Sequence, residues 1–559
     1  MKKNAPAQIL PDDPVELKKL LLTAQSTIAN YESKLSEKDR AYAILNEKYR
    51  LVLFDLYGKK SEKSSVPAVK ESHEQLPLFN EAELGITALE EEVLNLEEFE
   101  EDEQQVLKNE QKALTEHKAR KSRKKKQEKK QGGKVTFPDH LPRREVRHDL
   151  PEAEKAGRPL IKEDVTEELD IEVKLTVIRH IYPVYGEKKE SGENDKSVVS
   201  IGRAKRILPG CQYSDNFIAH TLAAKYHNGL PFYRQEQLHK SRNDLKVNRS
   251  RMCYWAVKIG SKLAELTFLM KQDIRSGPLI QMDETTVQVL KERNRPASTK
   301  SYMWVTVGTT RTYKKIILFN YFQNRSEEIP SLLLENYVGY LQTDGYQAYN
   351  EVDSNPGIKH IGCWAHVRRY FIKAEKVSKK AKSEKVALSF IRQIYFAEDK
   401  YRSLLKAGQL TEDEFIRQRK EAVLPILAKF KKWLDGKKLN VLPKGKLGEA
   451  IGYALGQWPK LTGYLDSAYT TPDNNFCENA IRPFVIGRKN WLFSDTPLGA
   501  YASATLYSLT ETAKANNLDP SKYLTYLLKN FPLAKTETDL RKLLPYNLTG
   551  ENIKNIKRS

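Results

Sequence analysis

The chain is poor in cysteine, has no long apolar run and shows no secretory leader. Its four cysteines lie far apart, at positions 211, 253, 363 and 477, and none belongs to a C-x-x-C pair. A disulfide-stapled scaffold is therefore excluded, and a reducing cytosol fits best. No run of about 18 apolar residues exists, so the sequence predicts no transmembrane span. The opening MKKNAPAQILPDDP lacks the apolar segment of a secretory signal, and we expect a cytoplasmic protein.

Acidic residues are outnumbered by basic ones. The chain has 94 Lys and Arg against 73 Asp and Glu, a formal net charge of +21 and a pI near 9.4. This surplus favours a polyanionic partner, either nucleic acid or an acidic membrane surface. At about 150 residues per domain, a chain of 559 residues predicts about four domains.

The first part of the chain, residues 1–60, has the repeat of a coiled coil. Apolar side chains recur alternately four and three positions apart between positions 17 and 52. A period of about 3.5 places them on one seam that must face another helix. The alternative is one long helix lying on the protein's own core. In either case this segment would serve assembly rather than chemistry.

A charged linker is predicted at residues 61–134. Residues 81–110 carry twelve acids and one base, whereas residues 117–134 carry ten bases and one acid. Blocks of like charge are usually solvated and mobile. The basic block could bind phosphates, or it could only neutralise the acidic block beside it.

Two smaller regions follow the linker. Residues 135–210 predict a small β module, because β-branched residues alternate from Asp164 to Tyr185 with the period of a strand. Residues 211–275 predict three helices, with Asp215 and Pro231 as start signals of the first two. These helices resemble a helix-turn-helix that enters a DNA groove, although small helical subdomains without that role are commoner. The basic residues of this region are Arg234, Lys240, Arg242, Arg249 and Arg251.

The remainder of the chain predicts an interrupted α/β unit. Residues 276–375 contain its first part, residues 376–470 are helical and charged with no strand signal, and residues 471–515 contain its second part. Residues 516–559 form a C-terminal helical tail. The strands of the first part are expected at 278–282, 302–307, 315–321, 337–343 and 358–362, with a helix from Trp364.

Three acids are candidates for the chemistry. Asp283 in LIQMDET and Asp344 in LQTDGYQAY follow predicted strands, where side chains of an α/β sheet converge on a ligand. Carboxylates on adjacent strands repel each other unless a cation lies between them, and Mg²⁺ takes hard oxygens. Glu478 in NNFCENAIRPFVIGRKNW is the best third carboxylate. Two ions about 4 Å apart would stabilise the attacking and leaving oxygens of a phosphoryl transfer.

Basic residues follow Glu478 in the same segment. Arg482 falls one helical turn later, and Arg488 and Lys489 come just beyond it. They could hold the phosphates being cut. The ordinary alternative for the whole set is structural, because an Asp at a strand end or a Glu paired with an Arg is common in proteins.

The strings around these residues are specific. MDETTVQVL, YMWVTVG, LQTDGYQAYN, IGCWAHVRRYF and above all CENAIRPFVIGRKNWLF resemble the DDE transposases of the insertion-sequence family numbered sixty-six, of the TnpC type. YGKKSEK, LPRREVRHDLP, VIRHIYPVY and LPFYRQEQL are similar to earlier segments of the same family. The resemblance therefore spans roughly residues 15–530.

The resemblance implies a fold and a set of metal ligands. The fold is an RNase H-like catalytic domain with an insertion before the glutamate, and the ligands of Mg²⁺ or Mn²⁺, as two ions, are Asp283, Asp344 and Glu478. The family also suggests residues that face the DNA or support Asp344, namely His366, Arg368 and Arg369.

The same resemblance implies an activity and partners. The enzyme would bind the terminal inverted repeats of its element, hydrolyse a phosphodiester there to free a 3′-hydroxyl, and join that hydroxyl to target DNA without a covalent enzyme intermediate. The partners are double-stranded DNA, at least a second copy of the chain, and small accessory proteins of the same element. The location is the bacterial cytoplasm, at the nucleoid.

Zinc is not expected. Family members usually carry a zinc-binding module with two cysteine pairs after the basic linker, but the corresponding places here read EKAGRPL and YGEKKESGENDK. DNA binding by this module is therefore in doubt. His360, Cys363 and His366 also lie close together in the sequence. That stretch crosses from strand to helix and no fourth ligand is evident, so we expect no zinc there either.

Two other functions stay open. A decayed copy would be a catalytically inactive DNA-binding remnant of a transposase, which the missing cysteines favour and the intact set of three acids opposes. A coiled-coil assembly factor would use only residues 15–130.

Overall fold

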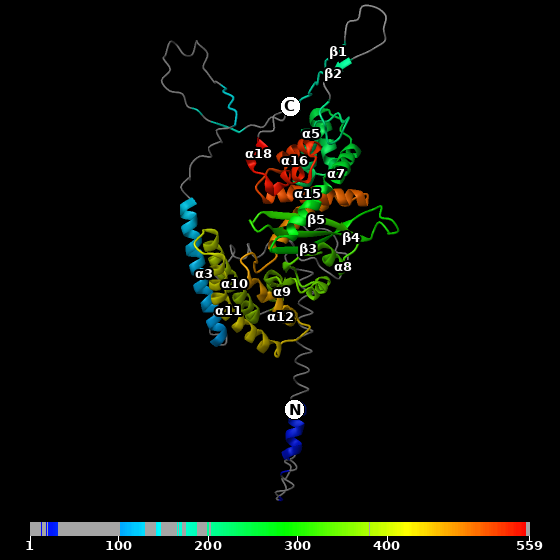
Figure 1. Ribbon diagram of the computed structural model, residues 1–559. Coiled ribbons are helices and arrows are strands. Elements are labelled where there is room, and N and C mark those ends of the chain that lie inside the picture. The colour runs from blue at the N-terminus through cyan, green and yellow to red at the C-terminus, as the bar shows by residue number, and fades with distance from the viewer. Residues whose placement is uncertain are drawn as a thin grey trace, which may run out of the picture. The chain divides into compact units, whose positions relative to one another are not determined.

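The computed structural model describes residues 13, 18, 21–31, 101–128, 141–146, 165, 167–169, 175–186, 198–200, 203–378 and 381–554. The chain divides into two compact units, one of residues Met1–Thr115 with Lys205–Ser559 and one of residues Glu116–Ala204. Helices dominate, and the larger unit contains a five-stranded sheet (Figure 1). The expected combination of helices with an α/β sheet is confirmed. No helix in these described ranges is long and apolar enough to cross a membrane.

The described part of the predicted linker, residues 101–128, is helical. Residues 21–31 form a helix, and the remainder of the predicted coiled coil lies outside the described residues. Helix α3 (Glu101–Glu128) corrects the prediction of a solvated segment, because its Val106 and Leu107 are buried. The carboxylate of Glu103 accepts hydrogen bonds from Trp433 and Lys437 at 2.9 Å each. The acidic block therefore docks on basic and aromatic residues farther along the chain.

The smaller unit contains one short pair of strands. Strands β1 (Val184–Gly186) and β2 (Val198–Ser200) are antiparallel. Residues 175–183, where a longer strand was expected, have no regular secondary structure, and Val177 is 94% exposed. Alternation of β-branched residues is not sufficient for a strand, because its backbone also needs a partner strand.

The three predicted DNA-binding helices are confirmed as helices. Ser214 rather than Asp215 caps the first, since its hydroxyl accepts the Phe217 N–H at 3.1 Å. Asp215 instead pairs with Arg206 at 3.0 Å. Pro231 directly precedes the second helix, as expected. The three are α5 (Asp215–Tyr226), α6 (Phe232–Asn243) and α7 (Arg249–Arg275).

The sheet has the order β5-β4-β3-β6-β7. Strands β3, β4 and β5 are successively antiparallel, whereas β6 and β7 run parallel to β3. All five expected strands are confirmed, but β3 continues past Asp283 because it pairs with β4 along its whole length. The strands are β3 (Leu279–Gln288), β4 (Lys300–Thr309), β5 (Lys315–Phe322), β6 (Gly339–Gln342) and β7 (Ile358–Ile361), with helices α8 (Glu328–Leu333) and η2 (Gln347–Ser354) between them.

The predicted helical insertion has a core of its own. Its centre is Phe430, which stacks on Phe390 with ring centroids 4.8 Å apart. Ile361 of β7 belongs to the same cluster, so the insertion is anchored to the edge of the sheet. Its helices are α10 (Lys382–Lys406), α11 (Glu412–Lys438), α12 (Lys446–Gly456), α13 (Trp458–Thr462) and η3 (Gly463–Asp466), and they follow α9 (Trp364–Val377) of the predicted first part of the α/β unit.

The last helices return to the sheet. They are α14 (Asn475–Trp491), α15 (Pro497–Ala515), α16 (Pro520–Asn530), η4 (Phe531–Leu533), α17 (Glu537–Lys542), η5 (Pro545–Asn547) and α18 (Gly550–Lys554). Helix α15 covers edge strand β5. Hydroxyls of Ser508 and Thr512 accept the N–H groups of Phe319 and Ile317 at 2.8 and 3.0 Å. These bonds satisfy backbone N–H groups at the edge of the sheet, which could otherwise pair with another strand.

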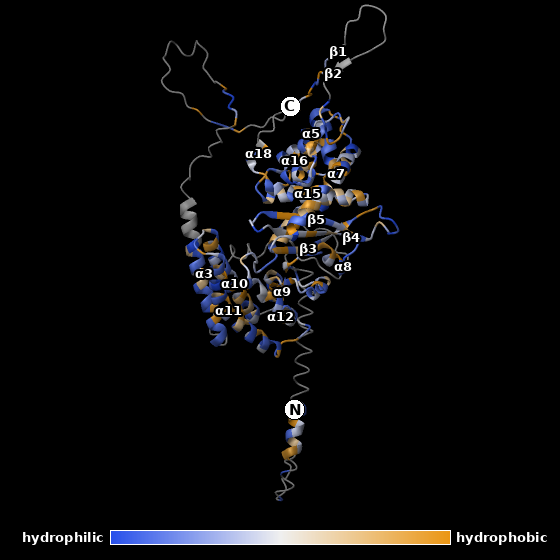
Figure 2. Ribbon diagram, viewed as in Figure 1, coloured by the Kyte–Doolittle hydropathy of each residue, from blue (hydrophilic) through white to orange (hydrophobic). Residues whose placement is uncertain are grey.

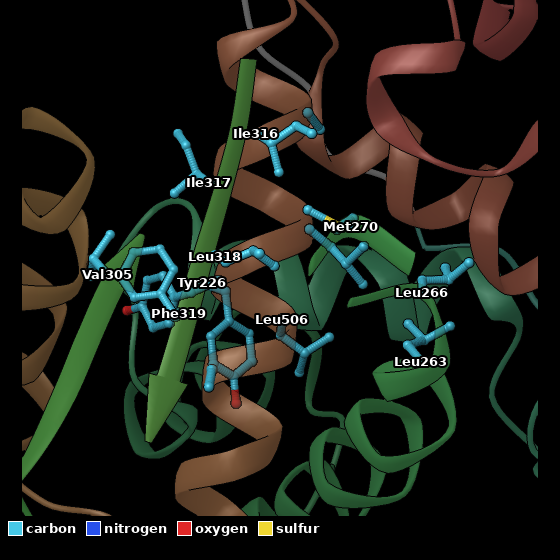
Figure 3. Packing of buried hydrophobic residues seen from close by; sticks show 14 of the residues in the cluster. Tyr226, Leu263, Leu266, Met270, Val305, Ile316, Ile317, Leu318, Phe319 and Leu506 are labelled. Atoms are coloured by element: carbon cyan, nitrogen blue, oxygen red, sulfur yellow. The ribbon is translucent and has the colours of Figure 1, made fainter. Parts of the chain in front are cut away.

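Apolar side chains of β5, α7 and α15 form the main core. Figure 3 shows Leu318, Met270 and Leu506 gathered where the three elements meet. The same region is strongly hydrophobic in Figure 2, whereas α3 and α11 are largely hydrophilic. Helices α7 and α15 cross at Gly260, where an added Cβ would lie 2.7 Å from the Cα of Ala502. This core packs against the sheet whose strand β3 carries Asp283.

Candidate active site

Asp283 and Asp344 lie level with each other on neighbouring strands. In the parallel pair of β3 and β6, Gln281 is opposite Gln342. Continuing this register by two residues places Asp283 opposite Asp344, just beyond the end of β6. Both aspartates are half-buried. Asp283 therefore lies inside strand β3, whereas Asp344 lies just after the end of β6.

Backbone amides hold both carboxylates. The Glu284 N–H donates to Asp283 Oδ1 at 2.8 Å, and the Tyr346 N–H donates to Asp344 Oδ1 at 3.0 Å. Between the latter pair stands Gly345, where an added Cβ would lie 2.7 Å from the ring of Tyr453. Only glycine fits there, so α12 of the insertion packs directly over the turn that carries Asp344.

Helix α14 begins beside β3 and carries Glu478 in its first turn. The side chain of Gln281 joins the two elements: its amide donates to the Asp473 carbonyl at 3.2 Å, and its oxygen accepts the Cys477 N–H at 3.1 Å. The carboxylate of Asp473 accepts the Asn475 N–H at 3.1 Å, just before the N-cap residue Asn474, which makes no side-chain capping bond. A strand residue thus sets the start of the helix and with it the place of Glu478.

The three acids interact electrostatically. The pKa of Asp283 is raised well above its ordinary value, first by burial and then by the negative charges of Glu284, Asp344 and Glu478. Such mutual repulsion between carboxylates is what a bound cation relieves. One oxygen of Glu478, Oε1, is also buried with no hydrogen-bond partner among the described residues. The oxygens of the three acids do not all lie within 4.8 Å of one another in the described part of the chain, but three carboxylates with an unused oxygen have the chemistry that a hard divalent cation takes.

Glu478 also contacts helix α9. Arg369 donates to Glu478 Oε2 and, at 3.1 Å, to Nε2 of His366. The Nδ1 atom of His366 lies 3.8 Å from Glu478 Oε1. Burial lowers the pKa of His366, which favours the neutral imidazole. Cys363 belongs to the same group. Its Sγ, one ring nitrogen of His366 and one carboxylate oxygen of Glu478 all lie within 4.8 Å of one another.

Comparisons with known sequences agree on one family. The profile described as Transposase IS66 family matches residues 210–502, just over half of the chain. The IS66 C-terminal element matches residues 508–546, and Transposase C of IS166 homeodomain matches residues 44–146. The chain belongs to the IS66 transposase family. The family resemblance expected from the motif strings is confirmed.

Relatives of this transposase occur in Sinorhizobium fredii (strain NBRC 101917 / NGR234). Its Uncharacterized protein y4qI is 30% identical over 435 residues, which cover 75% of this chain and 78% of the relative. Its Uncharacterized protein y4jD is 27% identical over 436 residues, which cover 75% and 82%. The similarity therefore covers most of this chain and most of each relative.

The basic residues near the transposase's carboxylates differ in what they contact. Arg488 points its NH1 group at β3, where it donates to Thr285 Oγ1 at 3.1 Å, to Thr286 Oγ1 at 2.8 Å and to the Thr286 carbonyl. Burial lowers the pKa of Arg488. One nitrogen of Arg488 is therefore used to hold β3, and its role at a DNA phosphate stays a prediction. Lys489 is exposed, and Arg482 is half-buried one turn from Glu478.

Arg368 interacts electrostatically with a residue of the insertion. It is half-buried, and its positive charge acts on the hydroxyl of Tyr395 in α10. Its neighbour Arg369, one residue later on the helix, faces Glu478 instead. Of the three residues that the family suggests for DNA contact or support, His366 and Arg369 lie next to Glu478.

A second buried acid stands beside Asp283. Glu284 forms an ion pair with Arg325, and its Oε2 accepts the Tyr349 hydroxyl hydrogen bond at 2.5 Å. The guanidinium of Arg325 also lies over the ring of Tyr346, 3.4 Å from its centroid. Arg325 therefore contacts Glu284, which follows Asp283, and Tyr346, which lies two residues after Asp344. The string MDET places Glu284 next to Asp283, but nothing in the sequence indicates Arg325.

His360 does not join the group of possible ligands. Its Nε2 lies 2.8 Å from the Thr343 hydroxyl and its Nδ1 lies 2.6 Å from Asp353. Both ring nitrogens are thus used for structure next to Asp344. The sequence suggests His360 with Cys363 and His366 as possible zinc ligands but predicts no zinc there; among the described residues, the group whose ligand atoms lie close together is Cys363, His366 and Glu478.

Proposed function

We propose that this chain is a DNA transposase that binds the terminal inverted repeats of its insertion sequence, hydrolyses a phosphodiester at each end and transfers the freed 3′-hydroxyl to target DNA. One observation carries the proposal. Asp283 and Asp344 stand level on adjacent parallel strands, and the charges of Asp344 and Glu478 both act on Asp283. These charges come from three separate segments of the chain, and their mutual interaction supports the proposal.

The order of the sheet supports an RNase H-like assignment. Three antiparallel strands, β3 to β5, are followed by two strands parallel to β3. The helical insertion lies between β7 and the helix that carries Glu478, where the family places it. We therefore assign the sheet with α14 and α15 to the catalytic domain.

Asp283, Asp344 and Glu478 would hold the divalent cations, Mg²⁺ or Mn²⁺, as two ions. When bound, such cations activate water and neutralise charge on the phosphodiester being cut. The chain's own residues do the positioning. The amides of Glu284 and Tyr346 orient the two aspartates, and Arg369 orients Glu478.

The partner we propose is double-stranded DNA, both element ends and target. Helices α6 and α7 present an exposed basic surface that could neutralise backbone phosphates: Arg234, Lys240, Arg242, Arg249 and Arg251. Lys489 adds an exposed charge after the catalytic helix. At least a dimer, through the predicted coiled coil, would hold two ends together. Accessory proteins of the same element complete the proposed set of partners.

Cleavage of the element's own end tests the proposal. A labelled duplex carrying the terminal repeat is incubated with the full-length protein in Mg²⁺ or in EDTA. We expect nicking at the end of the repeat only with Mg²⁺, and its loss in Glu478→Gln. Glu421→Gln is the matched control, because Glu421 is an exposed acid on α11 away from the carboxylates.

The outcomes separate the proposed enzyme from its alternatives. Cleavage retained by Glu478→Gln would overturn the site. Binding of the repeat without cleavage under any metal, even with the element's other proteins added, would favour the inactive DNA-binding remnant. Cleavage by a truncated chain that begins at residue 135 would exclude an assembly factor made only of residues 15–130.

A further inference from the structure

Cys363, His366 and Glu478 make up a cluster distinct in chemistry from the three carboxylates. One ligand atom from each lies within 4.8 Å of the other two. Thiol, imidazole and carboxylate together are the ligands of a borderline or soft divalent ion such as Zn²⁺, not those preferred by Mg²⁺. Three protein ligands with one open position also match the pattern of an accessible zinc site.

Two atoms of the cluster are buried without a hydrogen-bond partner among the described residues. These are Nδ1 of His366 and Oε1 of Glu478, which face each other at 3.8 Å. The Glu478 side chain is only 9% exposed. Leaving a buried polar atom unpaired costs free energy, so two such atoms that face each other indicate a place for a ligand.

The outer atoms of the same two side chains are already occupied. Arg369 donates to Oε2 of Glu478 and to Nε2 of His366. The contact with Glu478 can persist when an ion binds and would orient that ligand, whereas the contact with His366 belongs to the ion-free state. The inner atoms lie within 4.8 Å of each other and of Cys363 Sγ.

We propose that Cys363, His366 and Glu478 form a site for a thiophilic divalent cation, Zn²⁺ in the first instance, that shares Glu478 with the catalytic carboxylates. Binding there would withdraw Glu478 from Asp283 and Asp344 and stop cleavage. The inhibitory consequence rests on the proposed function, whereas the binding itself does not.

Binding of the ion changes where protons lie on two of the three ligands. The Cys363 thiol releases its proton to solvent as the metal–sulfur bond forms. His366 accepts a hydrogen bond at Nε2, so its proton is on Nδ1, and this proton must move to Nε2 when Nδ1 binds the ion. The hydrogen bond from Arg369 to His366 then breaks, while its bond to Glu478 stays. The thiolate and the carboxylate together neutralise the charge of the ion.

Cobalt(II) is the probe that tests the site, because a thiolate ligand gives Co²⁺ a sulfur-to-metal charge-transfer band. We expect the full-length protein to show this band, Cys363→Ala to lose it, and Zn²⁺ to displace the cobalt. Cys253→Ala is the matched control, since Cys253 is an exposed cysteine on α7. Asp283→Asn should keep the band, because Asp283 is not one of the three ligands.

Cleavage in Mg²⁺ gives the second readout. We expect Zn²⁺ to inhibit the wild-type protein and Cys363→Ala to need at least about tenfold more Zn²⁺ for the same inhibition. If Cys363→Ala fails to fold, Glu478→Gln is the second variant, and its cobalt affinity should fall at least about tenfold.

The possible results keep this inference separate from the proposed function. A band that is absent in the wild type, or unchanged in both Cys363→Ala and Glu478→Gln, overturns the metal site even if Mg²⁺-dependent cleavage is observed. A band that depends on Cys363 in a protein that never cleaves DNA would support the metal site and count against the proposed transposase activity.

Discussion

Arg369 on α9 donates a hydrogen bond to Oε2 of Glu478 on α14, although the two residues are 109 positions apart in the chain. Burial lowers the pKa of Arg369 and the Glu478 carboxylate raises it, with a net shift upward. Arg369 therefore keeps its positive charge beside Glu478, and the hydrogen bond holds the carboxylate in place before any cation arrives. Arg369 is a positioning residue for the glutamate that completes the candidate site.

Replacing Arg369 should separate the rate of cleavage from the affinity for metal. In Arg369→Gln we expect cleavage at saturating Mg²⁺ to fall about 10–100-fold, because Glu478 loses the group that orients it. The half-saturating Mg²⁺ concentration should not rise, since a positive charge has been removed from beside the ligands. Arg369→Lys is the conservative comparison, and it should recover only part of the rate because Lys lacks the planar fork. Wild-type rates in Arg369→Gln would contradict the positioning role.

The buried pair of Glu284 and Arg325 should show strong thermodynamic coupling. The Glu284 side chain is 3% exposed, so Arg325→Gln leaves a buried charge unpaired and should cost about 3–5 kcal/mol of unfolding free energy. Adding Glu284→Gln removes that charge, and the double variant should be more stable than Arg325→Gln alone. Urea unfolding of the three variants measures the cycle. Strict additivity of the two substitutions would show that the pair does not interact.

Asp283→Asn should stabilise the metal-free protein near neutral pH. The pKa of Asp283 is raised in the folded state, so the ionised carboxylate costs stability above its unfolded pKa of about 3.9. The cost is absent below that pH and grows as the pH rises toward the raised folded value. Thermal unfolding at several pH values measures the difference, with each kcal/mol worth about 2–4 °C. A variant that melts below the wild type at neutral pH would be the contrary result.

Arg488 and Lys489 offer a matched pair of neighbouring cations with opposite roles. Arg488→Gln removes donors from buried strand groups and should cost about 1–3 kcal/mol of stability, with the DNA affinity of the folded protein unchanged. Lys489→Gln should change stability by no more than about 0.5 kcal/mol. It should instead weaken binding of the terminal repeat and reduce its salt slope by about one. Titrations at several salt concentrations decide the assignment, and the reverse pattern would support Arg488 as a phosphate ligand.

Local patterns predicted most elements of the larger unit. The strands around Asp283 and Asp344 and the three helices before them lie where apolar periodicity placed them, because burial of one face imposes a period on the sequence. The predictions were wrong where the structure of a segment depends on contact with another element. The segment 175–183 has the alternation of a strand without being one, and the acidic residues 101–110 form a docked helix because bases distant in the chain pair with them.

The sequence by itself determined the family, through strings such as CENAIRPFVIGRKNWLF, and it singled out Asp283, Asp344 and Glu478. Only the tertiary structure decided what surrounds them. It turned Arg488 toward β3, brought Arg369 to Glu478, placed Arg325 beside Glu284, and grouped Glu478 with Cys363 and His366. The physical reason is that charge pairing and ligand geometry depend on distances between side chains. Those distances are set when separate strands and helices pack, and spacing along the chain does not contain them.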